Sequence, residues 1–175
     1  QLGYELPLLP GSKGIYHPCV EHNGLLYFSG HVSINTDGTF ITGKLGADIS
    51  DEEGMRAARQ CGLAILASVK TQMGSLDRIH RVVKLLGMVN AIPEFGRQPE
   101  VINGCSDLLV EVFGDRGRHA RSAVGVGSLP RGIPVEIEVI VEVEDAPARR
   151  AAAGKPAARK AAPKAKKKSA RKKKR

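Results

Sequence analysis

The chain has 175 residues, which is enough for one domain with a core of its own, and no run of about 18 apolar residues predicts a transmembrane helix. Its three cysteines and five histidines show no metal-ligand spacing, so we expect no structural zinc site, and we expect reduced thiols in a cytoplasmic protein. The net charge of +9 is unevenly divided: residues 1–146 carry 13 Lys and Arg against 18 Asp and Glu, a balance of −5, whereas residues 147–175 carry 14 Lys and Arg and no acid, a balance of +14.

The first half of the chain predicts an irregular start, two strands with a hairpin turn, and a helix. Prolines and glycines make residues 1–13 an irregular lead-in, residues 25–29 form a short apolar strand, and Asn35–Gly38 is a hairpin-turn signal. A helix begins with a Ser50–Glu53 capping box and ends before Gly74. One face of this helix is apolar, at spacings of three and four: Met55, Ala58, Gly62, Ile65 and Val69.

The second half predicts a strand, a helix and two further strands. Residues 79–90 are rich in Val and Leu and predict a central strand, and Pro99 fits the first turn of a second helix that ends at Gly114. The buried face of that helix consists of Val101, Cys105, Leu108 and Val112. This order predicts an α+β fold in which two helices cover one face of a single mixed sheet.

The last two strands carry the candidate site. Residues 121–127 and 133–144 alternate with a period of two around a turn at residues 129–132, which predicts a hairpin. In a simple register Gly125 lies opposite Glu136, and one face carries Arg121, Ala123, Gly125, Gly127, Glu136 and Glu138. The other face is apolar and is expected to pack under the helices; it carries Val124, Val126, Val135, Ile137, Val139 and Val141. We expect the polar face to pack against other copies of the chain and to build sites between subunits; an ordinary solvated sheet face is the alternative.

Several separated segments also agree in order and spacing with one known family. They are Tyr16, Leu26–Gly30, Asn103 at a helix start, Arg121-Ser122, Leu129-Pro130 and Val135–Glu138. In these segments, over about residues 14–144, the chain resembles the RidA (YjgF) family of reactive intermediate deaminases. The resemblance implies a chorismate-mutase-like α+β fold, a homotrimer with a site between subunits, and no cofactor.

The resemblance further implies hydrolysis of 2-enamine and 2-imine acids, such as 2-iminobutanoate and 2-iminopropanoate, to 2-keto acids and ammonia. Arg121 matches the arginine that holds the substrate carboxylate, a role that suits a guanidinium because it can donate two parallel hydrogen bonds. Glu136 matches the carboxylate that positions the attacking water and moves its proton. The other implied pocket residues are Tyr16, Ser29, Gly30, Ala123 and Asn103.

Two departures from the family pattern indicate a divergent subgroup. Position 123 is often cysteine in the family and is Ala123 here, and the residue after Ser29 and Gly30 is often glutamine and is His31 here. These changes favour a second hypothesis, a trimer that binds a small carboxylate without hydrolysing it. Some family members are called endoribonucleases, but no His pair or Lys/His set at motif spacing supports RNA cleavage by this chain.

Residues 147–175 consist almost entirely of Ala, Lys, Arg and Pro, so we expect a disordered tail. Its cations predict non-specific binding to nucleic acid, and it offers no aromatic residue to stack on bases and no apolar anchor for a membrane. A solvated tail that aids solubility is the alternative. In a bacterial host we expect association with the nucleoid, and in a eukaryotic host nuclear import. The polyanion-binding candidates are Lys164, Lys166, Lys167, Lys168, Arg171, Lys172, Lys173, Lys174 and Arg175.

Overall fold

The computed structural model describes residues 2–9, 11 and 15–144. The elements follow the chain in the order β1 (Cys19–His22), β2 (Leu25–Phe28), β3 (His31–Val32), α1 (Asp51–Met73), η1 (Leu76–Arg78), β4 (Ile79–Asn90), α2 (Gln98–Phe113), η2 (Gly114–Gly117), β5 (Ala120–Val126), η3 (Pro130–Gly132) and β6 (Val135–Val143), where η denotes a short 3-10 helix. The predicted basic tail lies outside the described residues.

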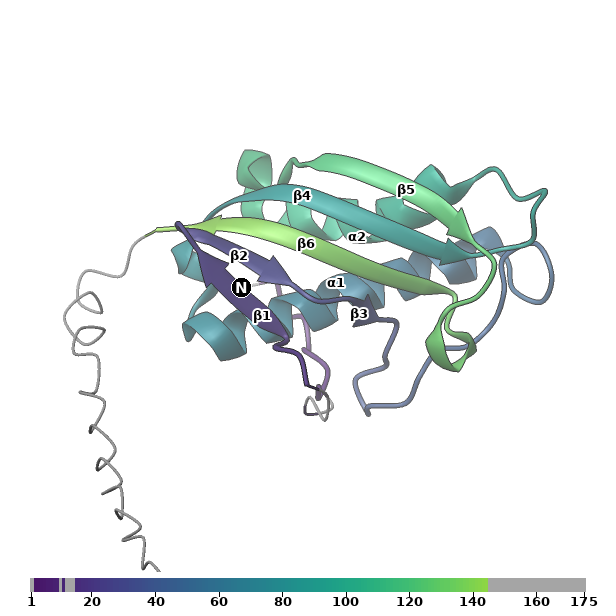
Figure 1. Cartoon of the computed structure of the whole chain (residues 1–175), viewed down its shortest axis with the longest axis horizontal. Helices are drawn as coiled ribbons and strands as arrows, with labels where there is room; N and C mark the ends of the chain where they lie inside the picture. The colour runs from purple at the N-terminus through teal and green to yellow at the C-terminus, as the bar shows by residue number, and fades with distance from the viewer. Residues whose placement is uncertain (1, 10, 12–14, 145–175) are drawn as a thin grey trace, which may run out of the picture. The chain divides into compact units, whose positions relative to one another are not determined.

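One mixed sheet and two long helices make up the fold. The strands lie in the order β1-β2-β6-β4-β5, and the two-residue β3 pairs with β6. Neighbouring strands are antiparallel except β4 and β5, which are parallel. Figure 1 shows α1 and α2 together behind the sheet, so the described helices leave its other face open. The predicted α+β architecture is confirmed, and none of these helices has the length and apolarity of a membrane span.

The last two strands do not form the predicted hairpin. β5 and β6 both pair with β4, which lies between them, so Met88 of β4 separates Val124 from Glu136. A twelve-residue strand can hydrogen-bond along both edges, and α2 is the crossover that makes β5 parallel to β4. The turn at residues 129–132 therefore carries the chain past the end of β4 and into β6, rather than back along β5.

The first two strands form a hairpin that the sequence analysis missed. β1 and β2 pair directly, with His22 opposite Leu25. The two residues between them, Asn23 and Gly24, have φ values of 51° and 76°. Positive φ at both positions is the requirement of a type I′ turn, and Asn-Gly is its preferred dipeptide.

Both helices begin and end as the sequence predicts. Ser50 and Glu53 form the reciprocal capping box of α1, and Gly74 ends this helix in the left-handed region at φ 77°. Pro99 lies in the first turn of α2, and Gly114 follows its last residue. A side-chain capping box therefore fixes the start of α1, whereas α2 begins at Gln98 and Pro99 without a side-chain cap.

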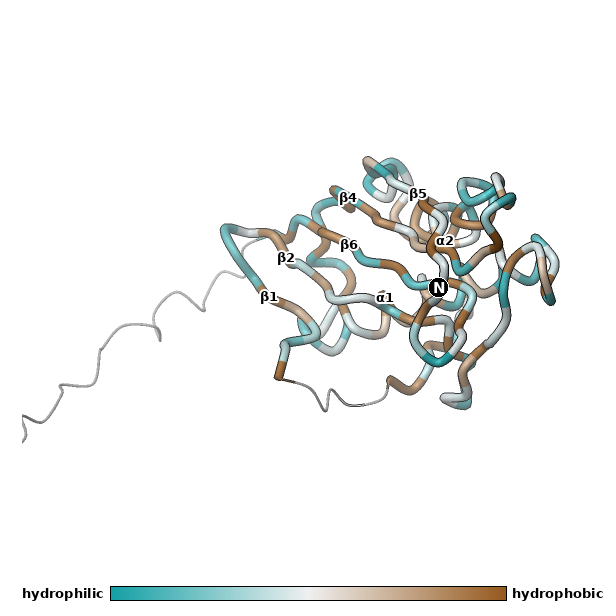
Figure 2. The backbone as a smooth tube through the Cα atoms, turned by 45° about the vertical axis from the view of Figure 1, so that its right-hand side comes forward, coloured by the Kyte–Doolittle hydropathy of each residue, from teal (hydrophilic) through white to brown (hydrophobic). Residues whose placement is uncertain are grey.

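The core lies between the helices and the sheet. Its sheet side consists of inward-facing residues of β4 and β6, such as Leu85, Val89, Val135 and Ile137, which are fully buried. Figure 2 shows apolar and polar segments alternating along β6, as expected for a strand with one covered face. Met55 begins the predicted apolar face of α1, but this residue is 36% exposed and lies outside the core.

At Met55 the backbone, rather than the side chain, contacts α2. A Cβ placed on Gly104 would lie 2.0 Å from the backbone oxygen of Met55. A main-chain oxygen inside a helix cannot move aside as a flexible side chain can. Glycine at position 104 is therefore what allows α1 and α2 to pack this closely.

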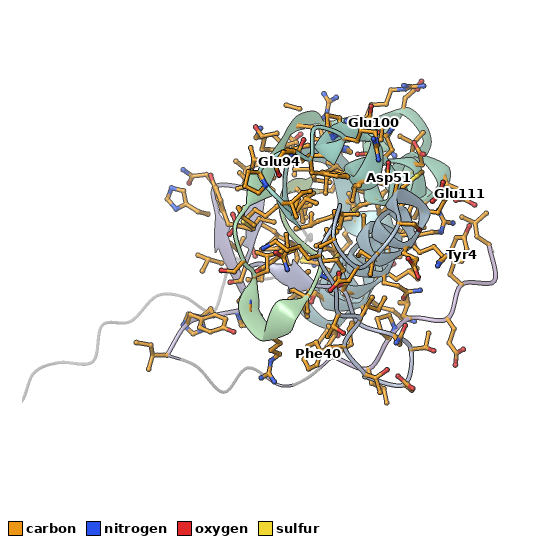
Figure 3. All side chains as sticks on the ribbon, turned by 90° about the vertical axis from the view of Figure 1, so that its right-hand side faces the viewer. Tyr4, Phe40, Asp51, Glu94, Glu100 and Glu111 are labelled. Carbon is orange, nitrogen blue, oxygen red and sulfur yellow. The ribbon has the colours of Figure 1, made fainter. Side chains whose placement is uncertain are left out.

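Residues 2–9 contain neither helix nor strand, as predicted, but side chains hold this segment against the helices. Leu6 packs against the core. The Tyr4 hydroxyl donates to Glu111 and accepts from Arg59 Nη2 at 2.7 Å, and Arg59 pairs with Glu111 at 2.8 Å. Figure 3 shows Tyr4 beside Glu111. The lead-in is thus attached to both α1 and α2.

The three cysteines are free thiols. Cys61 and Cys105 are fully buried, and burial raises the pKa of Cys61 and raises that of Cys105 to about 12. Cys19 is half-buried, and the same cause raises its pKa to about 11. All three are therefore protonated at neutral pH.

Replacing Gly104 with alanine should destabilise the fold by about 1–3 kcal/mol, because the new methyl group forces the two helix backbones apart. This cost exceeds the gain of up to about 1 kcal/mol that alanine brings to a helix interior. Denaturant unfolding should show a lower midpoint for Gly104→Ala. Gly96→Ala is the control, since a Cβ at Gly96 meets nothing within 4 Å. Equal midpoints for both variants would contradict this account.

Candidate functional site

Glu136 lies on the open face of the sheet, next to the Ser29–Gly30 segment that joins β2 to β3. A Cβ placed on Gly30 would lie 1.9 Å from Glu136 Oε1, so the carboxyl group rests directly against the Gly30 backbone. Burial, and to a smaller extent the neighbouring Glu138, raises the pKa of Glu136. This carboxyl group can therefore exchange a proton closer to neutral pH than an exposed glutamate can.

Arg121 lies on the other side of the sheet, under α2. Its Nη1 donates hydrogen bonds to Asn103 Oδ1 at 2.8 Å and to Ser106 Oγ at 3.0 Å, and both partners belong to α2. Among the described residues, no hydrogen bond or ion pair engages its Nε or Nη2. The guanidinium therefore keeps one edge free, with the two parallel N–H donors that a carboxylate accepts.

The prediction that Arg121 and Glu136 share one sheet face is wrong. Arg121 pairs with Leu85, whose side chain is fully buried beneath the helices. Glu136 instead alternates with Val135 and Ile137, which occupy that covered face. The guanidinium and the carboxyl group of one chain therefore lie on opposite sides of the sheet.

The size of the β5 side chains explains why Arg121 lies on the covered face of the sheet and not on the open face with Glu136. Ala123 packs against the core, and a Cβ on Gly125 would lie 2.8 Å from the side chain of Gln98 in α2. Small residues leave room for α2 on this side, so Val124, which we predicted to face the core, is 42% exposed on the open face. The apolar residues of β5 thus mark the uncovered face.

The other predicted site residues divide between these two groups. Ser29 and Gly30 lie with Glu136, whereas Asn103 and Ala123 lie with Arg121. Tyr16 precedes β1 and is 61% exposed. One copy of the chain therefore does not bring the whole predicted set together. In the part of the chain that the structure describes, no three His, Cys, Asp or Glu side chains gather as metal ligands.

A shallow cavity of about 300 Å³ lies on the open face beside Ser29. Its polar lining includes His17, Ser29, Lys84 and Glu138. Lys84 Nζ donates to Ser122 Oγ at 2.7 Å, and Ser29 Oγ donates to the His17 carbonyl at 2.9 Å. These contacts place an ammonium group and a hydroxyl on the same face as Glu136.

His31 holds the Ser29–Gly30 segment in place by linking it to α1. Its Nδ1 lies 2.7 Å from the Ser29 carbonyl and its Nε2 lies 2.6 Å from Ser68 Oγ in α1. Because a carbonyl only accepts, we assign the proton to Nδ1, and Ser68 then donates to Nε2. Burial lowers the pKa of His31, against the opposing effect of the Ser29 carbonyl. A neutral His31 therefore holds the backbone that faces Glu136.

A family model described as "YjgF/chorismate_mutase-like, putative endoribonuclease" matches residues 1–134. The chain belongs to the YjgF family. Protein TCP17 of Trypanosoma cruzi is 42% identical over 146 residues, which cover 83% of this chain and 91% of that protein. Among solved structures, protein Atu1372 of Agrobacterium tumefaciens, described as of unknown function, is 44% identical, with a TM-score of 0.75 and coverage of 81% of this chain and 87% of that one. A "putative endoribonuclease" of Shewanella oneidensis is 32% identical, with a TM-score of 0.77 and coverage of 81% and 93%.

The two departures from the YjgF pattern leave the polar groups of the candidate site in place. Ala123 lies on β5 beside Arg121, and its small side chain packs against the core. His31 is 8% exposed and binds Ser29 and Ser68. The hydrogen bonds of Arg121 come from Asn103 and Ser106 and do not involve either position.

Three residues around the candidate site were not predicted from the sequence. Ser106 bonds to Arg121, His119 bonds to Ser106, and Lys84 lines the cavity. Two signals were available: Ser106 follows Asn103 by three residues on one helix face, and His119 precedes Arg121 by two residues, immediately before β5 begins. Lys84 carries no comparable signal, because it lies in a run that also predicts a buried strand.

The burial of His31 makes the stability of the fold dependent on pH. Its pKa is lowered in the folded state, so the unfolded chain binds the proton more readily, and stability falls as the pH drops below about 6.5. Urea unfolding should give a smaller free energy at pH 5.5 than at pH 7.5. In His31→Asn, which cannot titrate, the difference between the two pH values should shrink although the variant is weaker overall. An undiminished difference would exclude His31 as its source.

Proposed function

We propose that this protein hydrolyses 2-imine and 2-enamine acids to 2-keto acids and ammonia, at a site formed between the subunits of a homotrimer. The observation that carries the proposal is the free Nε–Nη2 edge of Arg121. The remaining nitrogen of the guanidinium, Nη1, is held by hydrogen bonds to Asn103 and Ser106 of α2. The resemblance to the reactive intermediate deaminases supplies the reaction, and the described residues supply groups suited to each part of it.

Substrate binding falls to Arg121. A 2-imino acid carries a carboxylate next to its C=N bond, and the guanidinium can hold this carboxylate with two parallel hydrogen bonds. Asn103, bonded to Nη1, keeps the guanidinium in a fixed orientation. The reacting carbon then lies one bond from the anchored group, at a defined distance from the arginine.

The proton transfers fall to Glu136. As a carboxylate it accepts a proton from water, whose oxygen adds to the imine carbon, and it returns that proton to nitrogen to give an amino alcohol. It then takes the proton of the new hydroxyl group and passes it to the amino nitrogen, so that the C=O bond forms, the C–N bond breaks and ammonia leaves. Its raised pKa suits a group that must hold a proton in one step and release it in the next. The Gly30 backbone limits the space around the carboxyl group and so directs it.

The need for more than one subunit follows from the placement of Arg121 and Glu136 on opposite sides of the sheet. Since Arg121 and Glu136 of one chain lie on different sides of the sheet, a site that contains both needs Arg121 of one subunit and Glu136 of another. The open face offers apolar side chains for such a contact, as Val20, Tyr27 and Val124 are 41–50% exposed.

Arg121→Ala and Glu136→Gln should each abolish ammonia release from 2-iminopropanoate generated in situ by an amino-acid oxidase. A 1:1 mixture of the two variants, unfolded and refolded together, should regain about a quarter of wild-type activity, because random cyclic trimers pair an intact arginine with an intact glutamate at one interface in four. Each variant refolded alone is the control.

Four outcomes distinguish the possibilities. Activity that reappears only in the mixture supports a site shared between subunits. A mixture without activity, from an active wild type, excludes that arrangement. A wild type that binds pyruvate but releases no ammonia favours the non-catalytic carboxylate-binding trimer, and cleavage of RNA assayed in parallel would favour the activity named in the family description.

We also propose that residues 147–175 attach the trimer to nucleic acid without sequence preference. The argument rests on 14 cations and no acid in 29 residues, beside a domain whose own charge is −5. Such cations gain affinity by releasing counterions from phosphates, and three tails per trimer act together.

Removing residues 147–175 should abolish retention on duplex DNA or heparin at low salt. For the full chain, the logarithm of the binding constant should fall with the logarithm of salt concentration by about 0.9 per phosphate neutralised on duplex DNA. A chain of full length with glutamine at its nine last Lys and Arg positions controls for tail length. Retention that survives both changes would exclude the tail as the binding element.

A further inference from the structure

Arg121 extends from β5 at the edge of the sheet, and its guanidinium must be held in one orientation to receive a carboxylate. Both hydrogens of Nη1 are engaged, one by Asn103 Oδ1 and one by Ser106 Oγ. Two bonds to one nitrogen fix the plane of the guanidinium, as a single bond cannot. Ser106 is therefore needed, together with Asn103, to define where the free Nε–Nη2 edge points.

Ser106 is in turn held by His119. The distance from Ser106 Oγ to His119 Nε2 is 3.1 Å, and His119 Nδ1 lies 2.7 Å from the Gly117 carbonyl. Because the carbonyl only accepts, we assign the proton to Nδ1, which leaves Nε2 to accept from the Ser106 hydroxyl. The lone pairs of Ser106 Oγ are then left to accept from Arg121, and every donor in the series meets an acceptor.

The surroundings of His119 keep its ring neutral, as this assignment requires. Burial lowers its pKa, and the nearby cations Arg121 and Lys84 lower it as well, against the opposing effect of the Gly117 carbonyl. A protonated ring would donate from Nε2 toward Ser106. It would also add a second positive charge beside the guanidinium.

We propose that Ser106 and His119 are positioning residues for the substrate carboxylate: two hydrogen bonds in series hold the Arg121 guanidinium so that its Nε–Nη2 edge faces the ligand. This inference rests on the proposed function, since it takes Arg121 as the residue that binds the carboxylate. Ser106 and His119 themselves contact the guanidinium or its partner and not the reacting atoms. Affinity for the carboxylate, rather than the rate of proton transfer, is the quantity that they set.

The test uses four variants of the full chain. Ser106→Ala and His119→Phe break the series, whereas Ser106→Thr keeps the hydroxyl and His119→Gln keeps an acceptor at the position of Nε2. His80→Phe is the matched control, because His80 is an exposed histidine whose side chain is 55% accessible. Each variant is first shown to form the same oligomer as the wild type.

Two readouts are measured: steady-state hydrolysis of 2-iminopropanoate and equilibrium binding of pyruvate, the product, by calorimetry. Breaking the series should raise KM and the pyruvate Kd by about tenfold with kcat within about twofold of wild type, since one hydrogen bond to a charged group is removed. Ser106→Thr and His119→Gln should recover most of the affinity, and His80→Phe should match the wild type.

The outcomes separate this inference from the function on which it rests. Wild-type KM and pyruvate Kd in Ser106→Ala and His119→Phe, in an active protein, would overturn the inference and leave the proposed function standing. A fall in kcat with an unchanged Kd would also overturn it, because the effect would then lie on the chemical step. A wild type that neither hydrolyses the imine nor binds pyruvate would end both.

Discussion

β4 lies between β5 and β6, and the hydrogen bonds along its two edges decide on which side of the sheet Arg121 and Glu136 lie. Parallel pairing on one edge places α2 directly over β5, so the Arg121 side chain meets Asn103 and Ser106. Antiparallel pairing on the other edge turns Glu136 toward the open face. A different partner for β5 would change the side on which Arg121 lies, and with it the need for a second subunit.

The two charged groups of the proposed site are prepared in different ways. The guanidinium of Arg121 is surrounded by neutral acceptors, an amide oxygen and a hydroxyl, so its full charge stays available for a ligand. The carboxyl group of Glu136 is partly removed from water and lies near another carboxylate, so its charge is less stable. An ion pair between Arg121 and Glu136 within one chain would neutralise the guanidinium and lower the pKa of the carboxyl group. Because the sheet separates the two residues, each keeps its own property until subunits meet.

Local signals in the sequence were sufficient for the helices but not for the sheet. A capping box, a terminal glycine and a helical spacing of apolar residues identified α1, because all three act within a few residues. The alternation in β5 and β6 identified two strands but not their partners, since hydrogen bonding between strands joins residues far apart in the chain. The apolar residues of β5 also led to a wrong prediction of its buried face, because Val124 belongs to a face that none of the described helices covers. The resemblance thus gave the candidate residues, but which of them lie together depends on strand pairing, which no local signal in the sequence specifies.

The buried thiols of Cys61 and Cys105 can report local opening of the two helices. Cys61 in α1 donates a hydrogen bond to the Val135 carbonyl of β6, and Cys105 lies in α2 against Gly62. A thiol reagent needs both access and thiolate, and the folded state supplies neither at neutral pH. The rate at which each sulfur is labelled therefore measures how often its helix separates from its packing partner. The native sequence thus allows the motions of the two helices to be timed separately, without any introduced probe.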